Sequence, residues 1–451
     1  MKKIMTAVLL FLVLFPVFSQ KAEEPSAETD AKRLDTIRYG TETEIAALIQ
    51  TLKTENTPGM DDELITVAKN TRNRSILSGV FSFFAAREKT GLEERALKAI
   101  GERDDEANET VLAALAYLGK IKAVQAVLPI RSLLDAEESR FSGACIKALG
   151  LIGGSMPDAA ETAEYLIDYY QNRTPGDENR REIIIALGEM KAAAGAPFLQ
   201  EIVENNDERP VLRMSALDAL AKIGDPGGLP AVLQAVESAD PNIRSSAVAA
   251  LGPFQGDEVN KTILEAFRDG YYKTRMAAAQ AARDRRLAEA VPYLRFRAER
   301  DDVPAVKDEA IKALGAIGNS DSLAILSSLF AERKNTDRVR LLSAEMLLQD
   351  NASNYTAKVI EELDEAKQKN LTSLYNGFLR ILSTAKASDL EALARRFFVS
   401  GAVVEKSYAL DMVRNNNFRS LADQVRELTD EKYGSLSRKA KLVVEEMGIM
   451  Q

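Results

Sequence analysis

Few residues in this chain could support nucleophilic chemistry. Ser383 stands three residues before Lys386, a spacing found around nucleophilic serines. The chain has no histidine and one cysteine, Cys145, which lies in an apolar helical pattern and is predicted to be buried. Sites that pair serine or cysteine with histidine, and zinc sites built from cysteine and histidine, are therefore excluded.

A second short motif, Lys89-Thr90-Gly91, matches the Lys-Thr-Gly sequence that penicillin-binding enzymes combine with the serine motif. The two motifs stand in reversed order along this chain, and no strand pattern surrounds Lys89. Such a motif has meaning only within its own fold. Glycine-rich phosphate-binding loops are also absent from the sequence. We predict no catalytic, metal-binding or cofactor-binding residues.

The elements that would have to position any site belong to a repeat. An apolar marker residue, often preceded by alanine and followed by glycine, recurs at intervals of 31 to 38 residues. The markers are Leu118, Leu149, Leu187, Leu220, Leu251, Ala282, Leu314, Leu347, Ile381, Met412 and Val444. So steady a period indicates a repeat array. An inserted loop, residues 171–179, explains the one long interval.

Each period contains the signals of two helices. In one unit, Pro197 and Pro210 can each occupy the first turn of a helix, and Asn205-Asn206-Asp207 separates the two helices. Gly224 ends the second helix. Apolar residues recur at helical spacing, so each pair can bury its face only against neighbouring pairs. The sequence predicts an all-α fold.

The pattern Pro-x-x-Arg-x-x-Ala-x-x-Ala-Leu-Gly at residues 241–252, repeated at 304–315 with Lys307 for the arginine, resembles the HEAT repeat. It is most similar to the short variety first described in phycobilisome lyases. The resemblance covers residues 41–451 and is strongest over residues 179–318. It implies a right-handed α-solenoid, a HEAT-like superhelix of stacked helix pairs.

A basic residue lies seven positions before the marker in six successive units. These ladder residues are Arg180, Arg213, Arg244, Arg275, Lys307 and Arg340. They could bind an anionic ligand, but an arginine early in a helix can also reach acidic residues in the turns. Such turns contain Asp207, Asp240, Asp269, Asp301 and Asp337. The HEAT resemblance implies Asp–Arg pairs that join adjacent units, and we assign the ladder to stability.

The amino terminus predicts export. Lys2 and Lys3 precede an apolar run from Ala7 to Phe15, which is too short for a comfortable membrane span. We predict a signal peptide over residues 1–19, a charged tether over residues 20–40, and a periplasmic or extracellular protein; an uncleaved anchor is the alternative. Cleavage would leave 57 basic against 68 acidic residues, a net charge of −11. That charge disfavours nucleic-acid binding.

One segment departs from this acidic composition. Residues 268–300 contain nine basic residues and four acidic ones. Tyrosine and arginine are enriched where proteins bind each other. The candidate residues for binding an acidic segment of a protein partner are Tyr271, Tyr272, Arg283, Arg285 and Arg286. A solvated basic face is the alternative interpretation.

These features predict a non-catalytic scaffold that presents an extended helical surface to a protein partner. Two other functions stay open. One is a bilin lyase, which attaches a bilin to a cysteine of its partner, because the repeat resembles that of phycobilisome lyases. The other is an envelope protein that associates with itself. The sequence predicts no cofactor, and it leaves the identity of the partner and the oligomeric state open.

Overall fold

Proline and glycine mark helix ends in the computed structural model as they do in the sequence. Proline is the first residue of α12 (Pro210–Ile223), α14 (Pro241–Ala250) and α18 (Pro304–Ile317). Its fixed φ suits the first turn of a helix, where its missing N–H costs no helical hydrogen bond. α12 and α18 are followed by Gly224 and Gly318, whose φ values of 68° and 62° favour glycine.

The structure describes residues 27–55, 59–136, 139–173, 175–430 and 434–449. Contacts divide the chain into two units. The first contains the residues up to Thr162 and Gly176–Ala186, and the second contains Ala163–Pro175 and Leu187–Gln451. The described residues form helices and turns without any strand, which confirms the predicted all-α fold of stacked helix pairs.

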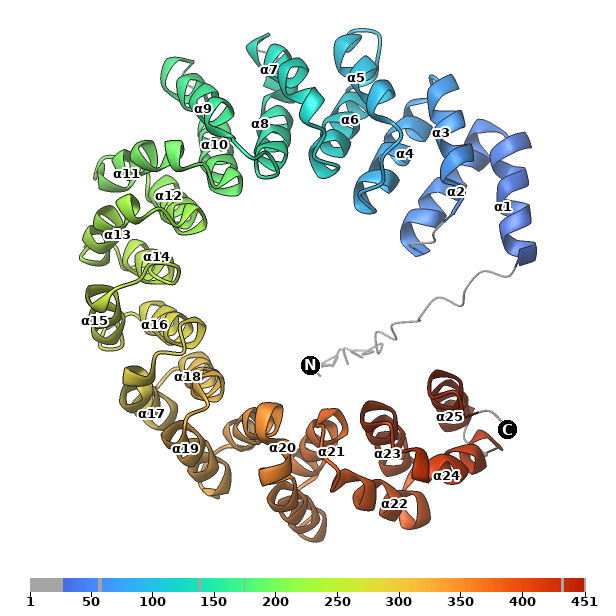
Figure 1. Ribbon diagram of the computed structural model, residues 1–451, viewed down its shortest axis with the longest axis vertical. Helices are drawn as coiled ribbons and strands as arrows, with labels where there is room; N and C mark the ends of the chain where they lie inside the picture. Colours follow the sequence, from blue (N-terminus) through green and yellow to red (C-terminus); the bar gives the residue numbers. More distant parts are fainter. Residues whose placement is uncertain (1–26, 56–58, 137–138, 174, 431–433, 450–451) are drawn as a thin grey trace, which may run out of the picture. The chain divides into compact units, whose positions relative to one another are not determined.

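Among the residues that the structure describes, the first unit contains eight whole α-helices. They are α1 (Ala27–Tyr39), α2 (Glu42–Glu55), α3 (Asp61–Asn70), α4 (Arg74–Ala86), α5 (Glu93–Gly101), α6 (Asn108–Lys120), α7 (Val127–Asp135) and α8 (Ser139–Gly153). Within this unit α4, α6 and α8 pack side by side in one layer, and α5 and α7 lie in the other (Figure 1). Residues of α9 (Ala160–Asn172) and α10 (Asp177–Met190) belong to both units.

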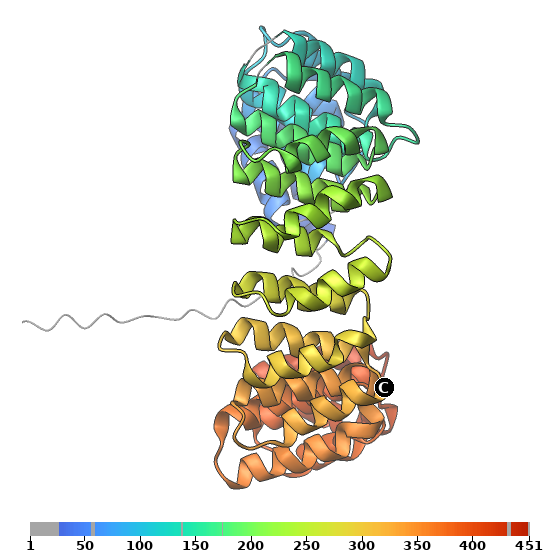
Figure 2. The same ribbon diagram turned by 90° about the vertical axis from the view of Figure 1, so that its left-hand side faces the viewer.

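The second unit has a two-layer arrangement of its own. Besides α12, α14 and α18, its helices are α11 (Ala196–Glu204), α13 (Leu229–Val236), α15 (Asp257–Ala266), α16 (Tyr272–Asp284), α17 (Val291–Arg300), α19 (Ser320–Ala331), α20 (Asp337–Gln368), α21 (Thr372–Thr384), α22 (Leu390–Ser400), α23 (Val403–Asn416), α24 (Ala422–Glu427) and α25 (Gly434–Glu446). Here α12, α14, α16 and α18 pack in sequence in one layer, with α11, α13, α15 and α17 in the other (Figures 1 and 2).

Two boundaries differ from the sequence prediction. α20 is a single helix of 32 residues. The repeat predicts two helices here, the second helix of one unit and the first helix of the next, with a break between them. Residues 350–353, Asp-Asn-Ala-Ser, contain neither proline nor glycine, so no strong breaker interrupts α20. The inserted loop is also shorter than residues 171–179, because α9 ends at Asn172 and α10 begins at Asp177.

Close packing between the second helices of adjacent repeats explains the Ala-Leu-Gly pattern. A Cβ atom built on Gly188 would lie 2.8 Å from the Cα atom of Ala219 in the next repeat. One built on Gly150 would lie 2.8 Å from the Cβ atom of Ala186. Since real Cβ atoms do not approach other heavy atoms so closely, the glycine and the alanine together let the two backbones meet.

The segment predicted as a tether, residues 20–40, is folded in part, which corrects that prediction. Helix α1 packs on α2 and α3, with Ile37 buried and the Arg33 guanidinium 2.5 Å from the Glu55 carboxylate. Burial of the apolar Ile37 side chain stabilises the packing of α1 on α2 and α3. Residues 1–26, including the predicted signal peptide, lie outside the described residues. Among the helices that are described, none combines the length and apolar character needed to cross a membrane.

Candidate protein-binding surface

Every ladder residue is the fourth residue of its helix. The positions are Arg180 in α10, Arg213 in α12, Arg244 in α14, Arg275 in α16, Lys307 in α18 and Arg340 in α20. A long side chain in the first turn of a helix points back toward the helix amino terminus. The ladder is therefore directed at the turns that join the two helices of each repeat.

Arg244 and Arg275 each bind an aspartate of the following repeat through two parallel hydrogen bonds. Arg244 donates from Nε and Nη2 to Asp269 at 2.8 and 3.2 Å. Arg275 donates from the same two atoms to Asp301, both at 2.8 Å. Two-pronged pairs of arginine and carboxylate are among the stronger hydrogen-bonded contacts in proteins. These two pairs join consecutive repeats in the way that the HEAT resemblance implies.

Three other ladder residues bind within their own repeat. Each donates to a carbonyl oxygen near the end of the first helix, where helical acceptors lack partners. The acceptors are Val203 for Arg213 at 2.9 Å, Glu299 for Lys307 at 3.1 Å and Phe330 for Arg340 at 3.0 Å. Arg340 also binds Glu362 at 2.6 Å. The ladder thus links the helices of one repeat as well as neighbouring repeats.

The pairing changes the acidity of the two aspartates. Burial alone would raise the pKa of Asp269, but hydrogen bonds from Arg244 and from the Tyr271 amide outweigh it and hold the pKa below its ordinary value. Burial also opposes ionisation of Asp301, whose pKa is lowered by Arg275 and by the Val303 amide. Both carboxyl groups are therefore ionised at neutral pH and stabilise the array in that form.

We expect this contribution to disappear in acid. Because the folded-state pKa values are lowered, each carboxylate stabilises the fold above its unfolded-state pKa of about 3.9, and the gain is lost as the pH falls through the folded-state pKa. In Asp269→Asn, the unfolding midpoint should depend less on pH below about 4 than in the wild type. Circular dichroism melts at a series of pH values measure this. Identical pH profiles for the two proteins would contradict it.

The residues predicted to bind a partner lie at opposite ends of α16. Tyr271 and Tyr272 stand at its amino terminus, and the Tyr271 hydroxyl donates to Asn242 Oδ1 at 3.0 Å. The three arginines lie at and beyond its carboxyl end; they are Arg283, Arg285 and Arg286. A helix of 13 residues is about 20 Å long, so the five side chains form two groups and not one surface.

Two of these arginines contact neighbouring repeats, and their binding of a partner stays a prediction. Arg285 donates to Asn260 Oδ1 at 2.8 Å and to backbone carbonyl oxygens of the turn between α14 and α15. Arg283 binds Glu309 in the next repeat. Arg286 is exposed, and Tyr272 is partly exposed. Binding of a protein partner by these two residues stays a prediction.

Aromatic and basic side chains gather on α17 and on the turn that follows α15. The Phe296 side chain is 49% exposed, and its ring centroid lies 5.1 Å from Cζ of Arg297 and 5.8 Å from Cζ of Arg300. The Arg268 guanidinium lies 5.6 Å from the ring centroid of Tyr293. We call these five residues the α17 surface; four of them, with Pro292, line a hollow of about 370 Å³.

The aromatic residues of the α17 surface were missed by counting charges alone. The basic residues of segment 268–300 are evident in the sequence, but Tyr293 and Phe296 carry no charge. Tyr293, Phe296, Arg297 and Arg300 are spaced by three, one and three residues, which places them on one side of a helix. That spacing is the signal that could have found them.

The arrangement suits binding better than catalysis. An exposed aromatic ring beside guanidinium groups can bury apolar area and pair with carboxylates. No cluster of metal-ligating side chains occurs among the residues that the structure describes. The Ser383 hydroxyl is buried and donates to the Arg380 carbonyl oxygen at 2.7 Å, and Cys145 is buried in α8.

Comparison with known families identifies the repeat. The model described as "Spirochaete HEAT repeat protein" matches residues 37–443. The chain belongs to the spirochaete HEAT-repeat family. The resemblance to HEAT repeats is therefore confirmed over most of the span predicted from the sequence. No curated protein matches this spirochaete HEAT-repeat sequence.

Two solved structures are similar to this chain at low sequence identity. The crystal structure of Kap121p is 13% identical, covers 92% of this spirochaete HEAT-repeat chain and 53% of its own, and has a TM-score of 0.45. For importin beta the identity is 13%, the coverages are 92% and 66%, and the TM-score is 0.46. The chain thus spans about half the length of Kap121p. These similarities concern the fold alone.

Proposed function

We propose that this protein is a non-catalytic scaffold that binds a protein partner through the α17 surface. The observation that carries the proposal is the half-exposed ring of Phe296 with two guanidinium groups close to it. Large aromatic side chains and arginine contribute most of the binding energy in protein interfaces. The partner segment would combine an apolar side chain, which covers Phe296, with carboxylates that face Arg268 and Arg300.

The charge of the α17 surface supports an acidic partner. Arg297 is 3.3 Å from Asp301, a carboxylate that Arg275 also binds, so this cation is balanced within the protein. Arg268 and Arg300 lie against aromatic rings, an arrangement that leaves their hydrogen-bonding edges available to a partner. An otherwise acidic chain therefore presents a locally basic surface here.

The proposal includes export. Lys2, Lys3 and the apolar run from Ala7 to Phe15 have the composition of a signal peptide, with cleavage after Ser19. The partner would then be another periplasmic, envelope or extracellular protein. Charge complementarity to an acidic partner would speed its association at low ionic strength.

Photo-crosslinking in cells tests the binding surface and export together. p-Benzoylphenylalanine placed at position 296 should yield one dominant adduct with a partner protein. The matched control places it at position 442, because Leu442 is also an apolar residue half exposed on a helix. Mass spectrometry of the adduct identifies the partner segment, and an amino-terminal peptide that begins at Gln20 supports export with cleavage.

The other outcomes separate the alternatives. An adduct between two copies of this chain would support self-association. Equal adducts from positions 296 and 442, or none at 296, would contradict the α17 surface as the binding site. An amino-terminal peptide that begins at Met1 in material recovered outside the cytoplasm would contradict cleavage and favour an anchor.

A further inference from the structure

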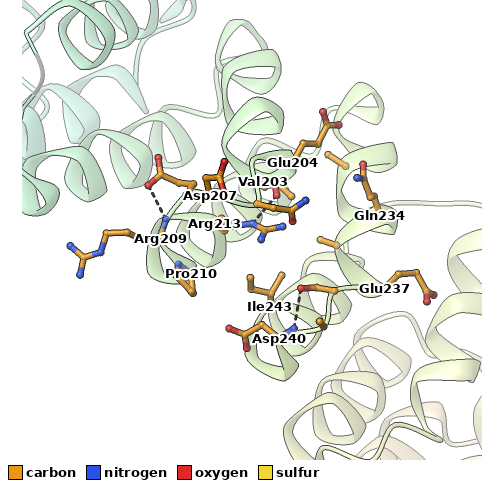
Figure 3. Close-up of a pocket in the computed structure, with 16 residues that line it drawn as sticks. Val203, Glu204, Asp207, Arg209, Pro210, Arg213, Gln234, Glu237, Asp240 and Ile243 are labelled. Carbon is orange, nitrogen blue, oxygen red and sulfur yellow. Dashed lines mark hydrogen bonds between the residues drawn. The ribbon is translucent and has the colours of Figure 1, made fainter.

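A second site lies between two consecutive repeats of the second unit. A cavity of about 760 Å³ opens between the turn from α11 to α12 and the turn from α13 to α14 (Figure 3). Arg213 and Ile243 contribute to its wall, and Glu204, Asp207, Glu237 and Asp240 contribute carboxylates.

Arg213 extends into this cavity with four of its five N–H donors unpaired among the described residues. The residue is 8% exposed, and its Nε atom donates to the Val203 carbonyl oxygen at 2.9 Å. Among the described residues, no acceptor binds its Nη1 or Nη2 atoms. Figure 3 shows the guanidinium reaching into the space between the two turns. A buried cation without a counter-charge is costly unless something supplies one.

The two following repeats show what is missing. Arg244 and Arg275 occupy the same helical position as Arg213, and each binds an aspartate that lies three residues before the next second helix begins. Both aspartates, Asp269 and Asp301, also accept a hydrogen bond from the amide two residues later. A carboxylate at this place in the turn therefore completes each interface.

At the Arg213 interface the equivalent residue is Ser238. It lies three residues before α14, and its hydroxyl accepts from the Asp240 amide, two residues later, at 3.3 Å. The turn thus has the same geometry and lacks the carboxylate. Asp240 does not replace it, because it lies directly before α14 and caps that helix by accepting from the Asn242 amide at 2.8 Å.

The rim selects the class of ligand. Glu204, Asp207, Glu237 and Asp240 make the opening acidic, which opposes entry of a simple anion. We propose that this cavity binds a partner segment in which one aspartate or glutamate is flanked by lysine or arginine. The carboxylate would occupy the place of the missing aspartate on Arg213, and the flanking cations would pair with the rim. The inference rests on the proposed binding function but not on the α17 surface.

The substitution Ser238→Asp tests the site by supplying the missing carboxylate from within the chain. It should raise the thermal unfolding midpoint by about 2 °C or more, since it completes a pair already present in the next two repeats. The matched control is Ser353→Asp, which adds the same charge to an exposed position of α20. A fall of the midpoint in Ser238→Asp alone would show that position 238 does not face Arg213.

The probe is a set of immobilised glycine-spaced peptides that contain Lys-Glu-Lys, with Lys-Gln-Lys and Glu-Glu-Glu as comparisons. The full-length wild type and Ser353→Asp should bind Lys-Glu-Lys about tenfold more strongly than either comparison, and Ser238→Asp should lose this preference. No preference in the wild type, or an equal preference in Ser238→Asp, overturns the inference. If the adduct at position 296 persists in that case, the proposed function stands while this site fails.

Discussion

Replacing Asp301 with alanine lowers the free energy of unfolding by about 3 to 5 kcal/mol. The Asp301 carboxylate is buried and accepts hydrogen bonds from Nε and Nη2 of Arg275, from Arg297 and from the Val303 amide. Its removal leaves the buried Arg275 guanidinium without its main counter-charge. Because Asp301 lies between repeats in the interior of the array, the loss also weakens the coupling of the repeats on either side.

Asp302 provides a matched control on the same arginine. Its carboxylate lies 3.1 Å from Nη2 of Arg275, but its side chain is 88% exposed. Asp302→Ala should therefore cost less than about 1 kcal/mol. Urea unfolding followed by circular dichroism compares the midpoints of the two variants. Equal shifts for Asp301→Ala and Asp302→Ala would mean that burial does not set the strength of this interface.

Replacing Gly188 with valine destabilises the fold by about 2 to 3 kcal/mol, because it forces two helices of adjacent repeats apart. Even the first added atom, Cβ, would lie 2.8 Å from the Cα atom of Ala219, and a backbone atom cannot rotate away as a side chain can. Valine adds two further methyl groups at this contact. We expect a lower thermal midpoint and a less cooperative transition in Gly188→Val.

The control for this effect is a helical glycine with open surroundings. A Cβ atom on Gly101, at the end of α5, would have no neighbour within 4 Å. Gly101→Val should change stability by less than about 0.5 kcal/mol, since glycine and valine differ little in helix propensity. Thermal melts of both variants give the comparison. If Gly188→Val melts like Gly101→Val, the glycine is not needed for close packing.

The repeat was readable in the sequence because each helix pair must bury an apolar face against the next pair. The markers from Leu118 to Met412 are buried, as this requirement demands. In the last repeat Val443 is buried, whereas the predicted marker Val444 is half-buried. Because no Leu-Gly pair fixes the register there, spacing alone could not distinguish two adjacent valines.

The candidate sites depend on the exact residues at which helices begin, and the repeat period does not specify these residues. The sequence period places Asp240, Asp269 and Asp301 in equivalent turns. On that basis the three aspartates were predicted to pair with ladder residues in the same way. Asp240 lies one residue before its helix, and the other two lie three residues before theirs. Such small offsets in helix boundaries are poorly specified by sequence patterns, yet they decide whether Arg213 has a partner.

The residues of the predicted cluster lie at the two ends of α16, which the sequence did not show. Charge counting does not show which arginines are already engaged, and Arg283 and Arg285 bind the neighbouring repeats. Phe296 lies in the same charged segment. It was not predicted to bind a partner, because most apolar residues of a repeat array are buried. Its exposure became evident only from the packed helices.

The affinity of the crosslinked partner segment for Phe296→Ala tests the binding scaffold most directly. Isothermal titration should show that Phe296→Ala binds this segment at least about tenfold more weakly than the wild type. The reason is that an aromatic side chain at the centre of an interface contributes a large share of the binding energy. Leu442→Ala should bind like the wild type and melt at the same temperature. A wild-type affinity in Phe296→Ala would contradict the account.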